Sequence, residues 1–316
     1  MPSDLTPTDV QSELIREEQL DLVDPLRHFL AMNDEPSPPP TSSDVRDLPS
    51  STDYSIVPQQ IESIIDRRTT IRYYQDLSRK PVLIDEQHPA PDGDAGKEWW
   101  DVHLKLDMTT GCGGKIWPAA EVLGAYIAGK YSSPPLPGSA EGKATVNAGF
   151  NNHNFDWRNK RIVELGSGTG LVGFLVHALH LSNCTISVTD QDVMLPLMRD
   201  NLQLNFPSST DSISVDELNW GTRLPPIFRE PLPDVLLLAD CVYLESAFQP
   251  LIDTMLDLST RETEILFCYQ KRRKADKRFF GLLKKNFVFE DVKDDDEVRC
   301  REYQRQGTQL LRIRRK

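Results

Sequence analysis

Two spacing patterns of hydrophobic residues alternate along the chain after residue 69. Short apolar runs, typical of buried strands, are separated by longer stretches in which apolar residues recur at helical spacing. The pattern predicts strands near 161–165, 184–189, 212–217, 234–239 and 263–269, and helices near 171–181, 192–204, 246–259 and 274–284. Strands that alternate with helices in this way predict a doubly wound α/β fold, whose mainly parallel sheet is covered on both faces.

The segments on either side of this region follow a different pattern. Before it, 70–74 and 102–107 alternate between polar and apolar residues as strands do, and 119–128 has the character of a helix. After it, 287–292 and 308–313 are predicted to be two strands joined by a charged loop. The sheet is therefore expected to finish with an antiparallel C-terminal hairpin.

Residues 1–60 differ in composition from the rest of the chain. They are acidic and rich in proline and serine, with too few apolar groups to offset the entropy lost on ordering. We predict a disordered N-terminal extension over 1–60 and a folded domain over 61–316. Apolar residues at helical spacing between Val10 and Leu30 make a docking helix an alternative for that segment. Within the domain, 132–158 is rich in Pro, Gly and Asn and is expected to be a loop insertion.

Charge and cysteine content narrow the functional classes. A formal net charge of −12 argues against broad nucleic-acid binding, which needs a basic surface. The five cysteines are odd in number and never form a Cys-x-x-Cys pair, which predicts reduced thiols, an intracellular protein and no metal site. No basic and apolar leader begins the chain, and no apolar run approaches the roughly 20 residues that span a bilayer. We expect a cytoplasmic protein with no membrane partner.

A glycine-rich turn follows the first strand of the alternating region. Glu164 lies near the strand end, Gly166, Gly168 and Gly170 follow, and the next strand ends at Asp190. The glycines permit a tight turn and a close approach of the backbone to a ligand, and an acid like Asp190 holds ribose hydroxyls in nucleotide cofactors. A carboxylate at Glu164 suits a cationic sulfonium cofactor and would repel pyrophosphate.

The same letters leave a second interpretation open. Gly168-Thr-Gly170-Leu-Val-Gly173 matches the G-x-G-x-x-G fingerprint of dinucleotide binding, so an NAD-dependent oxidoreductase is an alternative. The fingerprint begins two residues after the turn has opened, which favours the sulfonium cofactor.

Asp240 is a candidate for chemistry because it follows an almost wholly apolar strand, Val235–Ala239, and an unpaired buried carboxylate is costly. Tyr243, three residues further on, is a second candidate for chemistry, with an ordinary packing role as the alternative. The basic run Lys271-Arg-Arg-Lys274 follows the strand that ends near Tyr269, at the same rim of the sheet. A solvated face and a partner-binding role are equally open for this run.

Four motifs in this order resemble the seven-strand methyltransferases of family sixteen, the protein-lysine N-methyltransferases. They are Lys115-Ile-Trp117-Pro-Ala-Ala-Glu121, Glu164-Leu-Gly-Ser-Gly-Thr-Gly170, Asn219-Trp220 and Ala239-Asp-Cys-Val-Tyr243. The resemblance covers residues 69–316 and implies a Rossmann-like class I methyltransferase fold. The segment Tyr269–Lys277 is similar to the fungal branch that acts on translation elongation factor one-alpha.

The resemblance implies a set of site residues. Trp117, Gly166, Ser167 and Gly168 would surround the methionine and ribose end of S-adenosylmethionine, Asp190 would bind the ribose, Trp220 would lie near the adenine and Ala239 would line the floor. Asp240 and Tyr243 would face the acceptor lysine as catalytic residues. Without the other motifs, Trp117 and Trp220 would be interpreted as core residues.

The resemblance also implies a protein substrate and a reaction, the transfer of a methyl group to a lysine ε-amine. We expect a monomer. A class I methyltransferase that acts on a small molecule is an alternative, because a fold does not determine the acceptor. A noncatalytic adaptor that works through the acidic extension is a further one.

Overall fold

The computed structural model describes residues 64–85, 88–89, 98–131, 156–208, 211–272 and 276–316. The predicted extension over 1–60 and the larger part of the predicted insertion over 132–158 lie outside the described residues.

Seven strands form one sheet in the order β6-β5-β4-β7-β8-β10-β9. The strands are β4 (Arg161–Leu165), β5 (Thr185–Asp190), β6 (Ile213–Glu217), β7 (Val235–Ala239), β8 (Glu264–Gln270), β9 (Phe287–Asp291) and β10 (Thr308–Arg315). The strands from β4 to β8 pair in parallel, while β10 lies antiparallel between β8 and β9. The predicted fold class, a mainly parallel seven-stranded sheet with an antiparallel C-terminal hairpin, is confirmed.

Helices cover both faces of this sheet. They are α3 (Pro118–Tyr131), α4 (Leu171–Ala178), α5 (Leu195–Asn205), α6 (Phe248–Asp257), α7 (Asp276–Leu283) and α8 (Glu297–Arg305). Apolar residues of α3, α4 and α5 share one core cluster with one face of the strands, and those of α6 and α7 share a second cluster with the other face. Strands buried on both sides appear in sequence as uninterrupted apolar runs, which is why β7 and β8 were predictable.

The strand order reverses between β4 and β7. From β4 the chain builds outward through β5 to β6, and it then returns to the other side of β4 to start β7. In doubly wound sheets, ligands bind beyond the carboxyl ends of the strands at such a reversal. This end of the sheet carries the glycine turn and Asp240, because β4 ends at Leu165 and β7 at Ala239.

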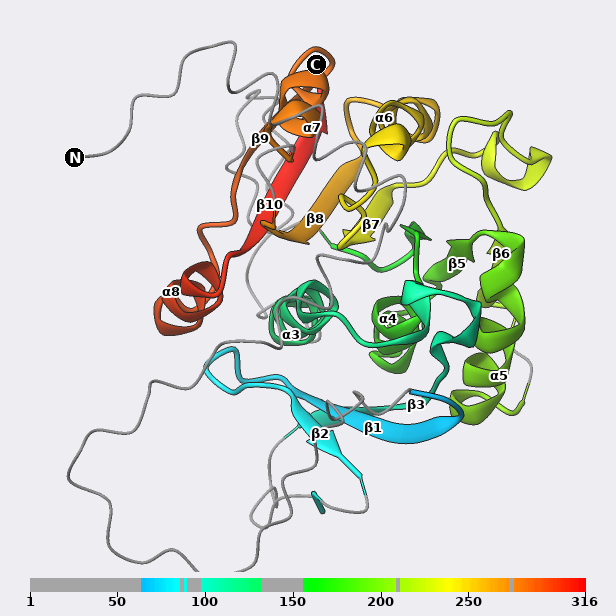
Figure 1. Cartoon of the computed structure of the whole chain (residues 1–316), viewed down its shortest axis with the longest axis vertical. Helices are drawn as coiled ribbons and strands as arrows, with labels where there is room; N and C mark the ends of the chain where they lie inside the picture. The colour runs from blue at the N-terminus through cyan, green and yellow to red at the C-terminus, as the bar shows by residue number, and fades with distance from the viewer. Residues whose placement is uncertain (1–63, 86–87, 90–97, 132–155, 209–210, 273–275) are drawn as a thin grey trace, which may run out of the picture. The chain divides into compact units, whose positions relative to one another are not determined.

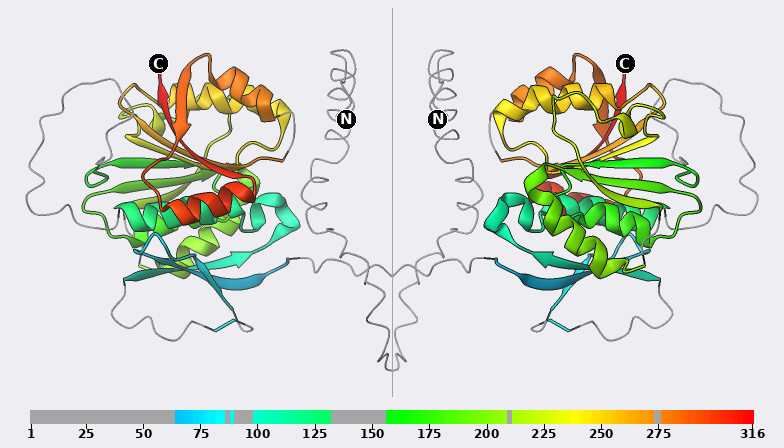
Figure 2. Two further views of the ribbon diagram at one scale, coloured as in Figure 1. Left: turned by 90° about the vertical axis from the view of Figure 1, so that its left-hand side faces the viewer. Right: turned by 90° about the vertical axis from the view of Figure 1, so that its right-hand side faces the viewer.

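A second, three-stranded sheet lies outside the α3–α5 layer, as Figures 1 and 2 show. Its strands are β1 (Arg67–Tyr74), β2 (Val82–Ile84) and β3 (Trp99–Leu106), in the antiparallel order β2-β1-β3. Strands were predicted at 70–74 and 102–107 and are confirmed there. The three-residue strand β2 was not predicted, because its length is too short for any periodicity to be visible.

Two asparagines of α5 satisfy the free edge of β3. The Asn201 side chain accepts from Lys105 N at 2.6 Å and donates to Lys105 O at 3.1 Å. One helical turn later, Asn205 repeats the pattern on His103, accepting from its N at 2.8 Å and donating to its O at 2.7 Å. Backbone N–H and C=O groups of an edge strand cost free energy when they are covered and left unpaired. By pairing these groups of β3, the two asparagines attach the small sheet to the main domain.

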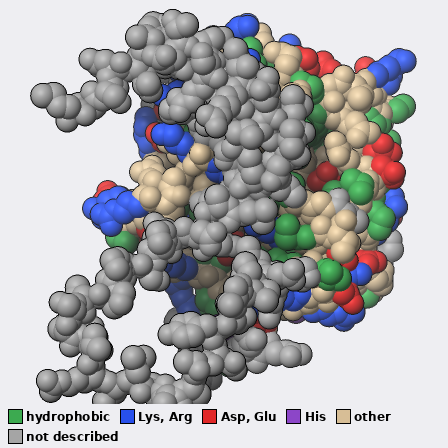
Figure 3. All heavy atoms as spheres, viewed as in Figure 1, with side chains coloured by type: hydrophobic (Ala, Val, Ile, Leu, Met, Phe, Trp, Pro, Cys, Tyr) green, Lys and Arg blue, Asp and Glu red, His purple; other side chains and the backbone are tan. Residues whose placement is uncertain are grey.

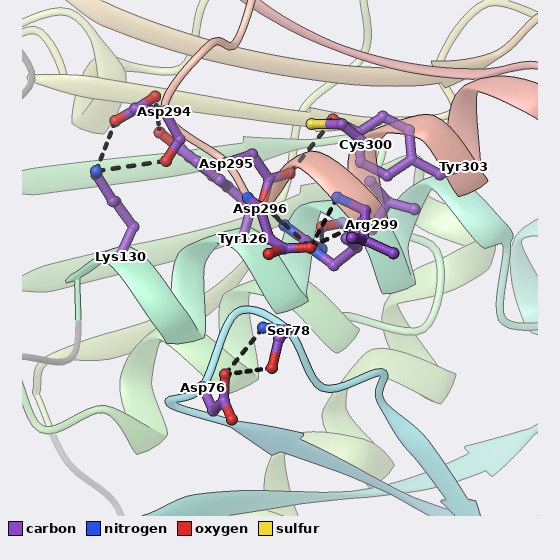
Figure 4. A network of polar contacts seen from close by, with 12 residues as sticks. Asp76, Ser78, Tyr126, Lys130, Asp294, Asp295, Asp296, Arg299, Cys300 and Tyr303 are labelled. Atoms are coloured by element: carbon purple, nitrogen blue, oxygen red, sulfur yellow. Dashed lines mark hydrogen bonds and ion pairs between the residues drawn. The ribbon is translucent and has the colours of Figure 1, made fainter.

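The charged loop predicted between β9 and β10 is instead largely the helix α8. Asp296 caps its first turn by accepting from the backbone N of Val298 and of Arg299. Figure 4 shows this region against α3, where Asp294 contacts Lys130 and Tyr126. The helix was missed because polar contacts, rather than an apolar stripe, hold it in place.

The end of the predicted insertion belongs to the core. Trp157 is 1% exposed, stacks on Tyr131 with ring centroids 4.0 Å apart and donates from Nε1 to the Glu264 carboxylate at 3.1 Å. Residues 156–158 are therefore part of the entry into β4. No helix in the described part of the chain combines the length and the apolar character needed to cross a membrane.

Replacing Asn201 by Ala is expected to lower the free energy of unfolding by about 2–4 kcal/mol, because three backbone groups, one buried and two part-buried, lose their partners. The matched control is Gln203→Ala on the exposed face of the same helix, with an expected change within about 0.5 kcal/mol. Urea unfolding measures both. Equal changes in the two variants would contradict the proposed attachment of the small sheet.

Candidate active site

The turn between β4 and α4 requires glycine at two positions for separate reasons. Gly166 and Gly168 have φ angles of 63° and 56°, which L-residues with a side chain adopt rarely. A Cβ on Gly166 would lie 2.7 Å from the Trp220 ring, and one on Gly168 would lie 2.7 Å from the carbonyl oxygen of Gly113. The turn therefore packs backbone against an indole on one side and against backbone on the other.

Asp190 holds this turn from the neighbouring strand. Its Oδ2 accepts from Gly168 N at 2.8 Å, and its Oδ1 accepts from Gln191 N at 2.7 Å. Burial raises the pKa of this carboxyl, and the two backbone donors oppose the shift. Because each carboxylate oxygen can accept a second hydrogen bond, the half-buried Asp190 retains capacity for a ligand hydroxyl.

Glu164 lies beneath the turn rather than beside it. The residue is 2% exposed, and its Oε2 accepts from the backbone N of Gly173 in the first turn of α4 at 2.9 Å. Burial raises the pKa of this carboxyl to about 8, against an opposing contribution from Gly173. The geometry differs from the direct contact with a cofactor that we expected for Glu164, since the carboxyl is occupied by the helix.

The Ser167 side chain is also occupied within the fold. Its hydroxyl donates to Glu164 O at 3.3 Å and accepts from Thr189 N at 3.1 Å. Its backbone is engaged as well, since Ser167 N donates to Thr189 O at 3.0 Å and Ser167 O accepts from Gly170 N at 2.8 Å.

Two indole rings flank the turn. Trp220 contacts Gly166, as described above. Trp117 donates from Nε1 to the carbonyl oxygen of Cys112 at 2.9 Å, in the short turn η3 (Cys112–Gly114) that also approaches Gly168. The Lys115 ammonium lies 3.8 Å from the centroid of the Trp117 ring, where cation and π system attract.

Asp240 begins the loop after β7 in a left-handed backbone conformation, with φ of 62°. Its backbone N continues the sheet by donating to Cys268 O at 2.8 Å. Its Oδ1 accepts from Gln270 N at 3.2 Å and from the Arg272 guanidinium at 2.8 Å, while its Oδ2 contacts the other terminal nitrogen of the same guanidinium. Asp240 and Arg272 thus form a bidentate ion pair.

Arg272 was not singled out from the sequence. It lies within the basic run for which a solvated face or a partner contact was expected, yet its side chain is 4% exposed and points inward to Asp240. Its guanidinium carbon is 5.2 Å from the centroid of the Trp117 ring. Only the position of the run, directly after a strand that ends at the ligand-bearing rim, could have indicated this role.

The remaining predicted residues lie in the same neighbourhood. Ala239 is half-buried at the end of β7, and the Cys241 thiol donates to Leu165 O at 3.2 Å. Burial, together with the nearby Cys112 and Asp190, raises the pKa of the half-buried Tyr243, so its phenol is neutral. The structure therefore brings Trp117, Asp190, Asp240 and Tyr243 to one end of the sheet.

The residues of this end fit S-adenosylmethionine better than a dinucleotide. Three donors of the turn are already used, since Gly168 N bonds to Asp190, Gly170 N to Ser167 O and Gly173 N to Glu164. A pyrophosphate needs such donors free at a helix N-terminus. Carboxylate acceptors, a glycine surface and aromatic rings instead suit a nucleoside joined to a cationic methionine. The fold and site define an S-adenosylmethionine-dependent methyltransferase.

Comparison with known proteins gives the family. A family model described as lysine methyltransferase matches residues 97–286, and the chain belongs to that family. It is a protein-lysine N-methyltransferase that uses S-adenosylmethionine. The chain is 36% identical to the protein-lysine N-methyltransferase EFM6 of Saccharomyces cerevisiae over 220 residues, which cover 66% of this chain and 82% of that protein.

Two animal relatives match shorter stretches. Protein N-lysine methyltransferase METTL21A of Danio rerio is 37% identical over 45% of this chain and 64% of its own length. EEF1A lysine methyltransferase 3 of Mus musculus is 33% identical over 49% of this chain and 65% of its own length. Among solved structures, a TehB-like SAM-dependent methyltransferase from Corynebacterium glutamicum aligns with 50% of this chain and 82% of its own, at 14% identity and a TM-score of 0.38.

The buried Glu164 predicts a pH dependence of stability. Its pKa is about 8 in the folded protein against an ordinary value of 4.5, so the folded state holds more protons between these values. The free energy of unfolding should fall as pH rises from about 5 to about 8, by up to about 1.4 kcal/mol per pH unit. Glu164→Gln should abolish this decline, as measured by urea unfolding at several pH values. Parallel curves for the two proteins would contradict the assignment.

Proposed function

We propose that this protein methylates a lysine ε-amine of translation elongation factor one-alpha. Two observations support this substrate. A relative from mouse is named EEF1A lysine methyltransferase 3, and the segment Tyr269–Lys277 is similar to the fungal branch with that substrate. The observation that carries the site itself is the meeting of the glycine turn, Asp190 and the Asp240–Arg272 pair at one end of the sheet.

For the cofactor, we assign the residues by what each can offer. Asp190 accepts from the ribose hydroxyls with its remaining lone pairs, Gly166 and Gly168 let the backbone approach, and Trp220 packs near the adenine. The Trp117 ring lies at the methionine end, and Ala239 lines the floor. Glu164 and Ser167 act indirectly, by stabilising the conformation of the turn.

When bound, S-adenosylmethionine supplies a methyl group already activated by its sulfonium sulfur. The task of the protein is therefore to orient the acceptor amine and to exclude water, which is a proximity effect. The amine must be uncharged, because an ammonium has no lone pair. Burial beside the Trp117 and Tyr243 rings lowers the pKa of an entering lysine by desolvation.

Asp240 orients that amine. Its Oδ1 already accepts two hydrogen bonds and its Oδ2 accepts one from Arg272, which leaves a lone pair of Oδ2 for an amine N–H. Tyr243, whose phenol is neutral, forms part of the wall of the acceptor slot.

We also propose that the protein acts in the cytoplasm as a monomer, with no nucleic-acid or membrane partner. In the described part of the face shown in Figure 3, basic and acidic side chains lie interspersed, unlike the one-sign basic surface that nucleic acid requires.

Asp240→Asn should lower the rate of methyl transfer by about 100-fold or more, the usual range for a lost proton-handling or orienting carboxylate. Calorimetric titration with S-adenosylhomocysteine should show cofactor affinity within about threefold of the wild type, because Asp240 lies on the acceptor side. Asp257→Asn, on the exposed face of α6, is the control with full activity. Full activity of Asp240→Asn would overturn its role, and binding of NADH in place of S-adenosylhomocysteine would restore the oxidoreductase alternative.

The substrate is tested with methyl-labelled S-adenosylmethionine and lysate of cells that lack this protein. One labelled band at the size of elongation factor one-alpha, with the label on lysine, is expected. Label in a different protein would replace the proposed substrate. Label confined to the small-molecule fraction would support the small-molecule alternative.

A further inference from the structure

Arg272 and Asp240 form a buried pair at the point where the acceptor lysine must enter. Their side chains are 4% and 3% exposed, and the guanidinium contacts both carboxylate oxygens. The Arg272 backbone is held in turn, because its N donates to the Asp276 carboxylate of α7 at 3.0 Å. Bidentate pairs of this kind fix both partners in one geometry.

The charge of this pair matters for the acceptor. A lone carboxylate beside a lysine favours the ammonium form and raises the pKa of that lysine. Such a site would bind the substrate well and hold it in the form that cannot react. With Arg272 in contact, the carboxylate and guanidinium together carry no net charge.

The other titratable and charged groups that face the pair do not supply this neutralisation. Lys115 and Cys112 face it from the segment before α3, Cys241 and Tyr243 from the loop after β7, Cys268 from β8 and Asp276 from α7. Asp190 of β5 lies near Cys112, Cys241 and Tyr243. Burial raises the pKa of the three thiols and of the phenol, so these four groups are neutral. Lys115 adds a second cation, but its ammonium lies on the Trp117 ring, whereas Arg272 touches the carboxylate itself.

We propose that Arg272 is a positioning residue that neutralises Asp240, so that the acceptor lysine occupies the slot as the uncharged amine. The proton of the lysine ammonium leaves to bulk water before the amine docks on Asp240. This inference rests on the proposed lysine acceptor and assigns to Arg272 the control of its protonation state.

The test is the pH dependence of single-turnover methyl transfer, measured between pH 6 and pH 10 with the protein band that the wild-type enzyme labels in lysate. Arg272→Met leaves Asp240 as an uncompensated anion, so the acid limb of the profile should move up by at least about one pH unit and activity should recover in alkali. Asp240→Asn leaves Arg272 as a lone cation, so the limb of its residual activity should move down. The double variant, Asp240→Asn with Arg272→Met, should return the limb to the wild-type position, although not the rate.

Arg272→Lys keeps the charge and should keep the wild-type profile, and S-adenosylhomocysteine binding across the pH range reports that each variant is folded. Should Arg272→Met fail to fold because of its buried unpaired charge, the comparison of Asp240→Asn with the double variant still decides. A merely structural role of Arg272 would lower the rate equally at every pH, and coincident limbs in these variants would overturn the inference while leaving the proposed function intact. A wild-type enzyme that labels no protein would overturn both.

Discussion

The turn from β4 to α4 depends on two carboxylates that accept the hydrogen bonds of its backbone. Glu164 accepts from Gly173 inside the first turn of α4, and Asp190 accepts from Gly168 at the tip. Without these acceptors, the backbone N–H groups of Gly168 and Gly173 would lose their partners, at a cost comparable to a lost hydrogen bond each. The position of the cofactor end of the site follows from this arrangement.

The two halves of the site differ in how their carboxylates are paired. The cofactor half carries one half-buried carboxylate, Asp190 of β5, which accepts from the turn and retains lone pairs for a ligand hydroxyl. The acceptor must be neutral when it reacts, and the β7–β8 half presents an anion closely paired with a cation. A site with unpaired acids in both halves would bind an ammonium firmly and leave it unreactive.

Much of the fold was predictable because its main strands are buried on both faces. Strands such as 161–165 and 234–239 were predicted to within a residue of β4 and β7, since an apolar run bounded by polar or glycine residues has few other interpretations. The helix α8 was not predicted, because its stability comes from Asp296 as a cap and from the Arg299–Asp295 ion pair instead of an apolar stripe. The attachment of β3 by Asn201 and Asn205 was likewise invisible, as it joins residues about 100 positions apart.

The sequence by itself determined the succession of strands and helices between residues 161 and 269, the glycine turn and the acids at the strand ends, because these depend on local patterns of burial and backbone freedom. The tertiary structure alone decided which acid remains at the rim of the sheet. Glu164 and Asp190 look alike in sequence, yet one is enclosed by α4 and the other remains half-buried at the rim. It also decided that Arg272 points inward, since its partner Asp240 lies 32 residues earlier, directly after a neighbouring strand. The charge of a side chain follows from the residue type, whereas its partner depends on which strands are adjacent in the sheet.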